Sequence, residues 1–199
     1  MMSKIITNIS QLDPNGTYSY ADYLLWKIEE RLELLRGKIF KMSPAPNVRH
    51  QRISGNLYFQ LRQKFYHKPC QLFAAPFDVR LYDRRKLVKA NKEIFTVVQP
   101  DIYVICDTTK LDEHGCNGAP DLVIEILSPG NTKKEMNQKF ELYEEAGVLE
   151  YWLVEPNDEV ILIYVLNDSG QYIGLRPATE IAKSAVFQEL AIDLAEIFH

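Results

Sequence analysis

The sequence predicts an α/β fold in which a mixed sheet is packed between helices. Two amphipathic helices are expected at Asn47–His67 and Thr132–Ala146, and apolar runs typical of strands lie between and after them. The run Pro120–Leu127 is almost continuously apolar, which is typical of a central strand covered on both faces. Hydrophobic residues make up 46% of the chain, which is enough for a sizeable core. We expect one domain over residues 1–199, with its core at about 47–155.

A short helix and a hairpin are expected before this core. Ser19 is a residue type that favours helix N-caps, so Ser19–Glu30 is expected to form a helix. Leu32–Met42 has the pattern of two strands around an Arg36-Gly37 turn. The Ser-Pro-Ala-Pro segment 43–46 then ends regular structure.

The core begins with the first long helix, in which apolar residues recur every four positions and form one stripe. A charged connection, Asp83–Glu93, separates the first two strands that follow. Three strands are expected before the second long helix: Leu72–Leu81, Thr96–Cys106 with an interruption at Pro100-Asp101, and Pro120–Leu127.

The second long helix has Asn131 or Thr132 as its cap and Gly147 as its stop signal. Peripheral strands and a last helix complete the chain after a short central strand. These elements are expected at Glu150–Val154, Val160–Val165, Tyr172–Leu175 and Asp193–Phe198. The predicted core order is therefore helix, three strands, helix, strand, which suggests a mixed sheet between helices.

Cysteine spacing and hydropathy indicate the state of the thiols and the location of the protein. Cys70, Cys106 and Cys116 are odd in number and form no CxxC pair, so we expect reduced, packed thiols and no thiolate zinc site. No apolar run approaches the roughly 18–20 residues of a membrane helix. Residues 1–13 lack the pattern of a signal peptide, which favours a cytoplasmic location.

Charge is distributed unevenly although the net charge is only −4. Residues 49–92 hold 11 basic and 2 acidic side chains, whereas the C-terminal half is strongly acidic. A basic stretch of this kind suits a phosphate backbone. It is equally typical of a solvated surface that balances the acidic half, and both interpretations stay open.

A buried acid and a buried base are expected to meet in the core. Glu125 lies in the apolar run, where strand alternation puts it on one face with Val123. An isolated buried carboxylate is very costly, so Glu125 needs a cation. Lys139 is four residues before Tyr143 on the apolar face of the second helix, so it can reach that strand. Asp101 would join the pair if its strand lies beside that of Glu125.

Two carboxylates on neighbouring strands suit Mg²⁺, with Mn²⁺ as a substitute, because Mg²⁺ prefers hard oxygen ligands and keeps several waters. A bound metal makes water more acidic and offsets charge on a phosphate, and a lysine can stabilise that charge. Asp101, Glu125 and Lys139 are therefore candidate catalytic residues of phosphodiester hydrolysis. The alternative is a structural Asp–Lys–Glu cluster that holds a helix to the sheet.

These residues belong to a longer recognisable pattern. The most specific segment is Gly118–Gly130, GAPDLVIEILSPG, followed by Lys139, Tyr143 and the segment 147–156, GVLEYWLVEP. Upstream, the pattern includes LELLRGKI at 32–39, His50 and FDVRL at 77–81. From about Tyr18 to Phe198 the chain resembles the Uma-two family of restriction-endonuclease-like proteins, in the PD-(D/E)XK nuclease superfamily.

The resemblance implies a restriction-endonuclease-like core and metal-dependent cleavage of nucleic acid, with DNA as the expected substrate. The superfamily Pro-Asp corresponds to Pro100-Asp101 and its later acid to Glu125. The superfamily lysine is expected two residues after that acid, where this chain has Leu127. The resemblance implies that Lys139 replaces it.

The first long helix lacks the Glu that superfamily members often carry there. Glu33 on the earlier hairpin is a candidate replacement, and His50 is a candidate supporting residue or phosphate contact. A homodimer is a reasonable expectation because many nucleases cut two strands.

Two alternative functions are open on sequence grounds. A nuclease-fold module that binds nucleic acid or protein without cutting is compatible with the modest net charge. Paired carboxylates also serve glycosidases, but the adjacent Lys139 and the lack of an aromatic carbohydrate pattern argue against that function. Asp78, Asp121 and Trp152 are interpreted as structural residues.

Overall fold

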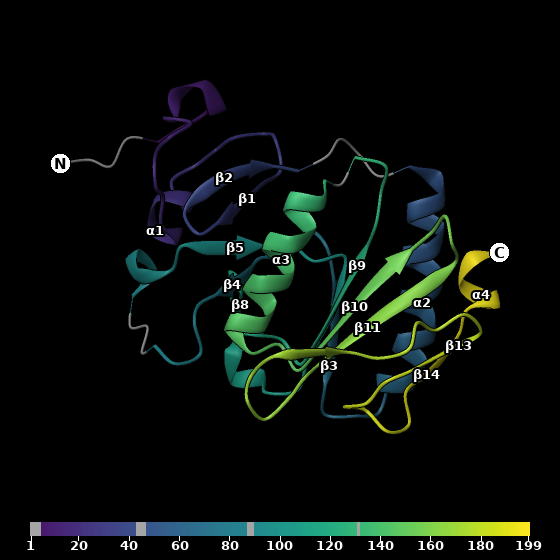
Figure 1. The fold of residues 1–199 in the computed structure, drawn as a ribbon. Helices are drawn as coiled ribbons and strands as arrows, with labels where there is room; N and C mark the ends of the chain where they lie inside the picture. The colour runs from purple at the N-terminus through teal and green to yellow at the C-terminus, as the bar shows by residue number, and fades with distance from the viewer. Residues whose placement is uncertain (1–4, 43–46, 87–89, 131) are drawn as a thin grey trace.

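One helix packed between two sheets organises the fold (Figure 1). The computed structural model describes residues 5–42, 47–86, 90–130 and 132–199. Within these residues, sheet 1 has the strand order β12-β11-β10-β9-β6-β3 and sheet 2 the order β2-β1-β5-β4-β8-β7. Helix α3 (Lys133–Ala146) lies against both, and α2 (Val48–Phe65) covers the other face of sheet 1.

Sheet 1 is mixed. Strand β9 is parallel to β10 and antiparallel to β6, and the remaining neighbours are antiparallel. Because β9 and β10 are parallel, the chain must cross over between them, and α3 is that crossover. The strands of sheet 1 are β3 (Gln71–Ala74), β6 (Ile102–Ile105), β9 (Leu122–Ile126), β10 (Glu150–Glu155), β11 (Val160–Leu166) and β12 (Tyr172–Gly174).

Both faces of β9 are buried, as its apolar run predicts. Leu122, Ile124 and Ile126 join the cluster beneath α2, whereas Val123 joins the cluster beneath α3. The apolar stripe of α2, with Ile53 as a member, fills the first cluster. Strand alternation therefore directs Glu125 toward α3.

Sheet 2 contains the predicted hairpin. Its turn has Arg36 at φ 50° and Gly37 at φ 78°, the left-handed conformations that a tight two-residue hairpin requires. Strand β1 of the hairpin pairs with β5, and β1 and β4 contact α3. The strands of sheet 2 are β1 (Leu32–Leu35), β2 (Lys38–Lys41), β4 (Val79–Leu81), β5 (Thr96–Val98), β7 (Leu111–Asp112) and β8 (Gly115–Asn117).

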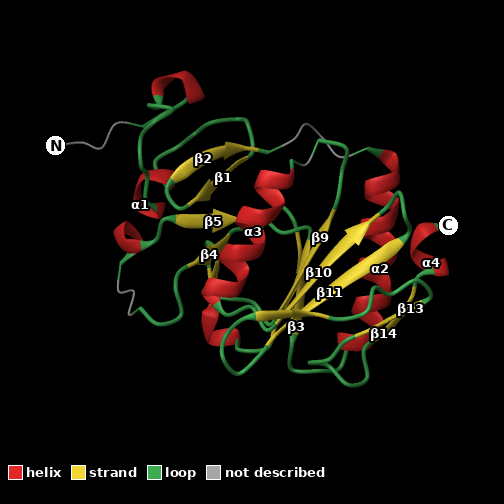
Figure 2. Ribbon diagram, in the orientation of Figure 1, coloured by secondary structure: helices red, strands yellow, loops and turns green. Residues whose placement is uncertain are grey.

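Short elements complete the molecule (Figure 2). The hairpin of β13 and β14 and helix α4 lie beside α2, where they close the first apolar cluster. These short elements are η1 (Ile9–Gln11), α1 (Tyr20–Tyr23), η2 (Asn91–Glu93), η3 (Thr108–Lys110), β13 (Ile181–Lys183), β14 (Ala191–Asp193) and α4 (Ala195–Phe198). No helix of the described residues is long and apolar enough to cross a membrane.

The predicted fold class and core order are confirmed, since α2, β3, β6, β9, α3 and β10 follow one another around sheet 1. The caps of α3 are also as predicted. Thr132 accepts a hydrogen bond from the Glu135 N–H, and Gly147 ends the helix at φ 89°. Asn131 and the segment 43–46 lie outside the described residues.

Two predicted strands are wrong in their extent. Leu72–Leu81 divides into β3 and β4, and Thr96–Cys106 divides into β5 and β6. Strands β3 and β6 belong to sheet 1, whereas β4 and β5 belong to sheet 2. Pro76 and Pro100 lie at the two breaks, and proline has no N–H for a strand ladder. The chain thus passes twice between the sheets at these prolines.

The predicted helix Ser19–Glu30 is also too long. Ser19 and Asp22 form a reciprocal cap, as expected, but α1 ends at Tyr23. The Lys27 N–H donates to the Ile6 carbonyl at 2.6 Å, and Ile6 pairs with Trp26 in a β-bridge. This pairing draws the chain out of the helical conformation.

The expectation of three reduced thiols is wrong. Cys70 and Cys106 form a disulfide between the ends of β3 and β6, and Cys116 is a buried free thiol. Gln71 pairs with Ile105 in these antiparallel strands, so the two cysteines are opposite one another when the register is extended by one residue. Spacing along the chain could not reveal this pairing.

A buried carboxylate ties the C-terminal segment to sheet 1. Glu150 is fully buried and accepts hydrogen bonds from Trp152 Nε1 at 2.6 Å, Ser184 Oγ at 2.7 Å and Val186 N at 3.0 Å. Glu150→Ala would leave buried donors unpaired, so we expect a loss of about 3 kcal/mol in the free energy of unfolding. Chemical denaturation checks this value.

Glu180→Ala, at an exposed position, is the control and should change stability by less than about 0.5 kcal/mol. Glu150→Gln should lower the free energy of unfolding less than Glu150→Ala does, because the glutamine amide oxygen still accepts a hydrogen bond. Equal stability of Glu150→Ala and the control would contradict a structural role for this carboxylate.

Candidate active site

Two strands of sheet 1 bring the candidate carboxylates together. In the antiparallel pairing of β6 and β9, Ile102 is opposite Ile124. Extending this register by one residue places Asp101 opposite Glu125. The Ile126 N–H donates to Asp101 Oδ2 at 2.8 Å, which holds the aspartate against the end of β9. Both side chains keep some exposure, 22% for Asp101 and 13% for Glu125.

Lys139 reaches this site from α3, as its helical face predicts. Its Nζ lies 3.0 Å from Glu125 Oε1, and the residue is only 8% exposed. Lys133, in the first turn of the same helix, is exposed. The structure therefore brings Asp101, Glu125 and Lys139 to one place between α3 and sheet 1.

Glu33 joins the same cluster from sheet 2. Its Oε1 lies 3.1 Å from Lys139 Nζ and also accepts the Gln99 N–H at 2.8 Å. Glu33 is 1% exposed, so its charge is held inside the protein by these donors. Lys139 is thereby shared between a carboxylate of sheet 1 and a carboxylate of sheet 2.

Sequence reasoning missed Tyr143 as a partner of the site. Its hydroxyl donates to Glu125 Oε1 at 2.6 Å, so this oxygen accepts hydrogen bonds from both Tyr143 and Lys139. The signal was present, because Tyr143 is four residues after Lys139 on the same helical face. It was interpreted as packing alone.

His50 approaches Asp101 from α2. Its Nε2 lies 3.3 Å from Asp101 Oδ2, and the side chain is 8% exposed. Asn47 caps α2 by accepting the His50 N–H at 2.8 Å, which fixes the first turn beside the end of β9. His50 therefore contacts one of the two candidate carboxylates.

Burial and charge shift the proton affinities of the site. Burial raises the pKa of Glu125 to about 7, although the Lys139 charge lowers it. Burial opposes the charge on Lys139, yet the charges of Glu125 and Glu33 raise the pKa of this lysine above its usual value. Burial also lowers the pKa of His50, but its hydrogen bond to Asp101 and the charge of Asp101 raise it more. The charge on Lys139 is thus favoured by its carboxylate neighbours, and the pKa of the Glu125 carboxyl is raised by burial.

The donor set fits a hard divalent cation. Asp101 Oδ1 and Glu125 Oε2 make no hydrogen bond to any described residue, so each carboxylate keeps one oxygen for a ligand. Among residues 5–42, 47–86, 90–130 and 132–199, no three His, Cys, Asp or Glu side chains form a metal-binding group. A pair of carboxylates is nevertheless what Mg²⁺ often takes, since it keeps several waters.

A cavity of about 350 Å³ has neither carboxylate in its wall but is lined by His50, the residue that contacts Asp101. His50 forms part of its wall, together with Arg49 and Lys133 from the first turns of α2 and α3. Arg49 is paired with Glu159, so Lys133 and the two helix N-termini are the groups that would attract an anion such as a phosphate to this cavity. Its other walls are Asn47, Leu127, Ser128, Pro129, Met136, Glu155, Pro156 and Asn157.

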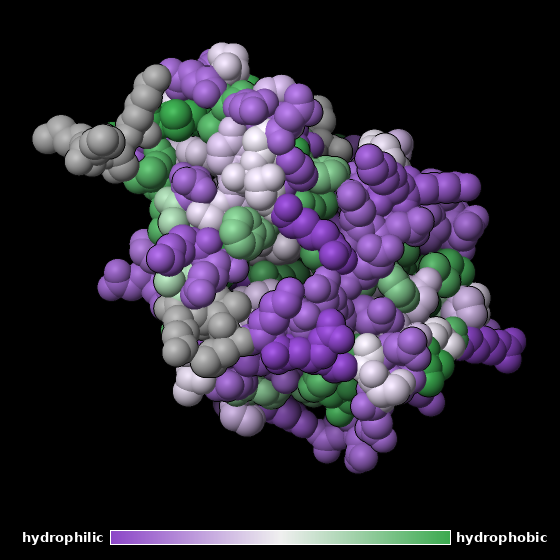
Figure 3. All heavy atoms as spheres, turned by 60° about the vertical axis from the view of Figure 1, so that its left-hand side comes forward, coloured by the Kyte–Doolittle hydropathy of each residue, from purple (hydrophilic) through white to green (hydrophobic). Residues whose placement is uncertain are grey.

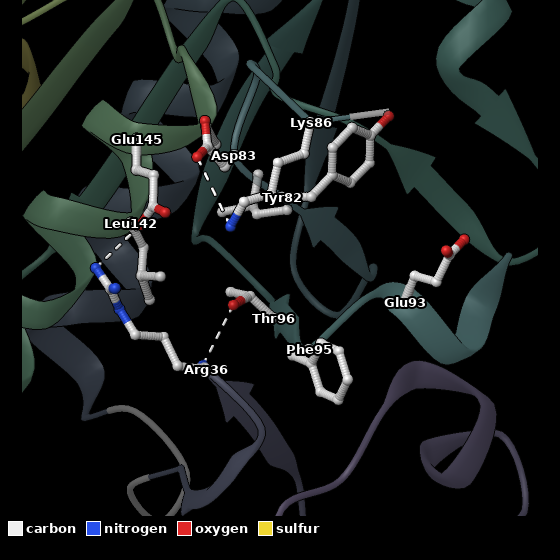
Figure 4. A pocket seen from close by; sticks show the side chains of 11 residues that line it. Arg36, Tyr82, Asp83, Lys86, Glu93, Phe95, Thr96, Leu142 and Glu145 are labelled. Carbon is white, nitrogen blue, oxygen red and sulfur yellow. Dashed lines mark hydrogen bonds and ion pairs between the residues drawn. The ribbon is translucent and has the colours of Figure 1, made fainter. Parts of the chain in front are cut away.

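A second cavity of about 330 Å³ lies at the other end of α3 (Figure 4). Leu142 and Phe95 give it apolar walls, and Arg36 turns toward Glu145, with 3.0 Å between Arg36 Nη2 and Glu145 Oε2. The hairpin side of the molecule is mostly hydrophilic, with apolar areas between (Figure 3). No candidate catalytic residue lines this cavity, and its arginine is already neutralised.

The carboxylates interpreted as structural have structural partners. Asp78 accepts a hydrogen bond from Gln99 Nε2 at 2.9 Å. Asp121 accepts the Cys106 N–H at 2.7 Å, at the end of β9 remote from Glu125. Trp152 is fully buried in sheet 1.

Comparisons with known proteins agree with this architecture. The Uma-two family model, described as "Putative restriction endonuclease", matches residues 20–195. An uncharacterized protein of Synechocystis is 26% identical over 163 residues, which are 80% of each chain. A crystal structure described as a putative nuclease belonging to DUF820, from Anabaena variabilis, is similar with a TM-score of 0.69. It is 19% identical and covers 91% of this chain and 97% of its own.

The burial of Lys139 between two carboxylates predicts a large effect of its removal on stability. Lys139→Met removes the cation and leaves Glu33 and Glu125 buried together, so that each carboxyl must either remain an uncompensated charge or take up a proton. We expect a loss of about 3–5 kcal/mol in the free energy of unfolding at pH 8, measured by urea denaturation. Lys133→Met, on the exposed first turn, is the matched control.

Adding Glu33→Gln and Glu125→Gln to Lys139→Met should restore much of the lost stability, because no buried charge then remains. If Lys139→Met is as stable as Lys133→Met, the three side chains do not form the charge network described above.

Proposed function

Because this chain belongs to the Uma-two family of restriction-endonuclease-like proteins, we propose that it is a metal-dependent endonuclease that hydrolyses the phosphodiester bonds of DNA. The family supports a nuclease, and its fold is shared with a crystal structure described as a putative nuclease. The metal, the DNA substrate and the residue roles given below are our inferences.

One observation carries the proposal. Two carboxylates from neighbouring strands, Asp101 and Glu125, lie together with one oxygen each directed to no described partner, and Lys139 lies beside them. Asp101 and Glu125 are 22% and 13% exposed, so these two oxygens are open to a ligand from the solvent. They leave room for a cation, and the cavity lined by His50 leaves room for a phosphate.

Asp101 and Glu125 would hold Mg²⁺, for which Mn²⁺ would substitute. The ion supplies an acidified water nucleophile and offsets charge on the phosphate. Tyr143 and Lys139 fix one oxygen of Glu125, so the other oxygen has a defined direction. This preorganisation lowers the cost of assembling the site.

Lys139 has a separate role in the proposal. Its charge lies within hydrogen-bond distance of Glu125 and favours the ionised form of that carboxyl. The same cation would stabilise negative charge that develops on a phosphate nearby. Glu33 holds Lys139 in position, which is the part that we infer for this residue.

A nuclease-fold module that binds nucleic acid or protein without cutting is the second candidate. Lys139 Nζ is engaged with two carboxylates, and a lysine in that position stabilises the fold whether or not it also serves chemistry. Measurements of metal binding and of nucleic-acid cleavage distinguish the endonuclease from the binding module.

Metal binding is the first test. Calorimetric titration of Mg²⁺ and Mn²⁺ into the protein at pH 8 should give a binding heat in the wild type and none in Glu125→Gln, because an amide carries no charge for the ion. Asp121→Asn, at the other end of β9, is the matched control and should bind as the wild type does. A folded wild type that binds neither ion would exclude the proposed metal site.

Cleavage is the second test. Asp101→Asn keeps an oxygen for the Ile126 N–H but loses the charge, so nicking of plasmid DNA should slow by about 100-fold or more. Asp78→Asn, which alters a carboxylate bonded to Gln99, should cleave at close to the wild-type rate. Equal rates for Asp101→Asn and the wild type would rule out our assignment. A wild type that binds metal but cuts no nucleic acid would favour the binding module.

His50 is expected to act through Asp101 as a positioning residue. His50→Ala should weaken Mg²⁺ binding about tenfold, since loss of an outer partner misorients a ligand. His50→Gln, whose amide can still donate to Asp101, should retain most of the affinity, and Gln51→Ala on the exposed side is the control. Equal metal affinity in all three variants would leave His50 with a packing role only.

A further inference from the structure

The outer face of α2 carries side chains that no described element covers. Val48, Phe59 and Tyr66 are 76%, 62% and 60% exposed. Together with Arg52, Gly55 and Arg62 they recur at three- and four-residue intervals on the side opposite the buried stripe. We name these six residues the α2 stripe.

The α2 stripe is basic and free of acids. Helix α2 has no Asp or Glu in its 18 residues. Arg52 and Arg62 form no ion pair with a described residue. Three other basic residues of the stretch 49–92 are paired with acids elsewhere, in the pairs Arg49–Glu159, Lys68–Glu189 and Arg80–Asp112. The predicted basic stretch therefore offers unpaired arginines on this helix face.

Aromatic rings alternate with these arginines. The Arg62 guanidinium lies over the Tyr66 ring, 4.9 Å from its centroid. Phe59 stands two helical turns before Tyr66. A side-chain carbon added at Gly55 would meet no atom of another described element within 4 Å, so the surface there is open. Exposed rings between unpaired arginines provide stacking planes for unpaired bases and contacts for their phosphates.

The N-terminal end of the α2 stripe, Val48, is next along the chain to residues of the cavity near the candidate active site. Asn47, Arg49 and His50, at the start of α2, line that cavity. From there the helix extends for about 27 Å at 1.5 Å per residue. Figure 1 shows α2 running along the outer side of sheet 1 away from the end of β9.

From these observations we propose that the α2 stripe binds a single-stranded segment of nucleic acid that leads to the active site. The inference rests on the proposed function for the identity of the polyanion. A second copy of the chain does not fit, because two α2 stripes in contact would oppose Arg52 and Arg62 of each copy without an acid. A duplex would leave the exposed rings without stacking partners.

Binding of a fluorescent 15-residue oligodeoxythymidine tests the proposal by polarisation in EDTA, where metal-dependent cleavage cannot proceed. The Arg52→Ala/Arg62→Ala variant should bind about tenfold more weakly than the wild type. Because each lost phosphate contact lowers the salt slope for single strands by about 0.7, the slope of log affinity against log salt should fall by about 1.4. Phe59→Ala should lower the affinity for the oligonucleotide about tenfold without changing the slope of log affinity against log salt.

Matched controls lie on other surfaces. Lys27→Ala/Lys183→Ala removes two exposed cations, and Ile173→Ala removes an apolar side chain that is 53% exposed. Both should bind the oligonucleotide as the wild type does. If these controls lost as much affinity for the oligonucleotide as the α2 variants, binding would not depend on the α2 stripe, and the proposal would be overturned.

Three other outcomes would also overturn it. These are unchanged affinity in the α2 variants, tighter binding of a matched duplex that is independent of Phe59, and a dimer that Phe59→Ala converts to a monomer without a change in affinity. Asp101→Asn should retain oligonucleotide binding. Failure of the proposed cleavage would therefore be distinguishable from failure of this surface.

Discussion

The burial of Lys139 between two carboxylates is the constraint on which the site depends. A single charge in this interior would cost several kcal/mol, and only close pairing with good hydrogen bonds offsets that cost. Glu33 comes from sheet 2, Glu125 from sheet 1 and Lys139 from the helix between them. The three charges can be satisfied only when both sheets pack against α3 in one arrangement. The network therefore specifies how the two sheets meet, in addition to any stability that it contributes.

The same network leaves a charge imbalance at the end of β9. Glu125 and Glu33 pair with Lys139, whereas Asp101, opposite Glu125, has His50 as its partner, which is charged only when protonated. Repulsion from Asp101 and Glu33 adds to burial in raising the pKa of Glu125 to about 7. A divalent cation between Asp101 and Glu125 would relieve that repulsion, since it favours the ionised form of both groups. The repulsion between carboxylates that destabilises the cluster without a ligand would therefore favour binding of a metal ion.

Local pattern predicted the parts of the structure that depend on local physics. Continuous apolar burial identified β9, helical spacing placed Lys139 on the face of α3, and the cost of a buried charge joined Lys139 to Glu125. The division of two strands between sheets was not predicted, because apolar patterning is the same whichever sheet a strand joins. Glu33 is 106 positions from Lys139, and the partners Cys70 and Cys106 meet through strand register. No property of a short segment encodes contacts of that kind.

The position of the lysine links the site to the N-terminal hairpin. In the superfamily pattern a lysine two residues after the acid belongs to the same strand, where this chain has Leu127, packed in the cluster beneath α3. Lys139 instead reaches Glu125 from the helix, with its Nζ 3.0 Å from Glu125 Oε1. A lysine on the strand would depend on sheet 1 alone, whereas Lys139 also needs Glu33 and therefore β1 of sheet 2. If the proposed roles hold, loosening of the hairpin would release Lys139 and disable the site while sheet 1 stays folded.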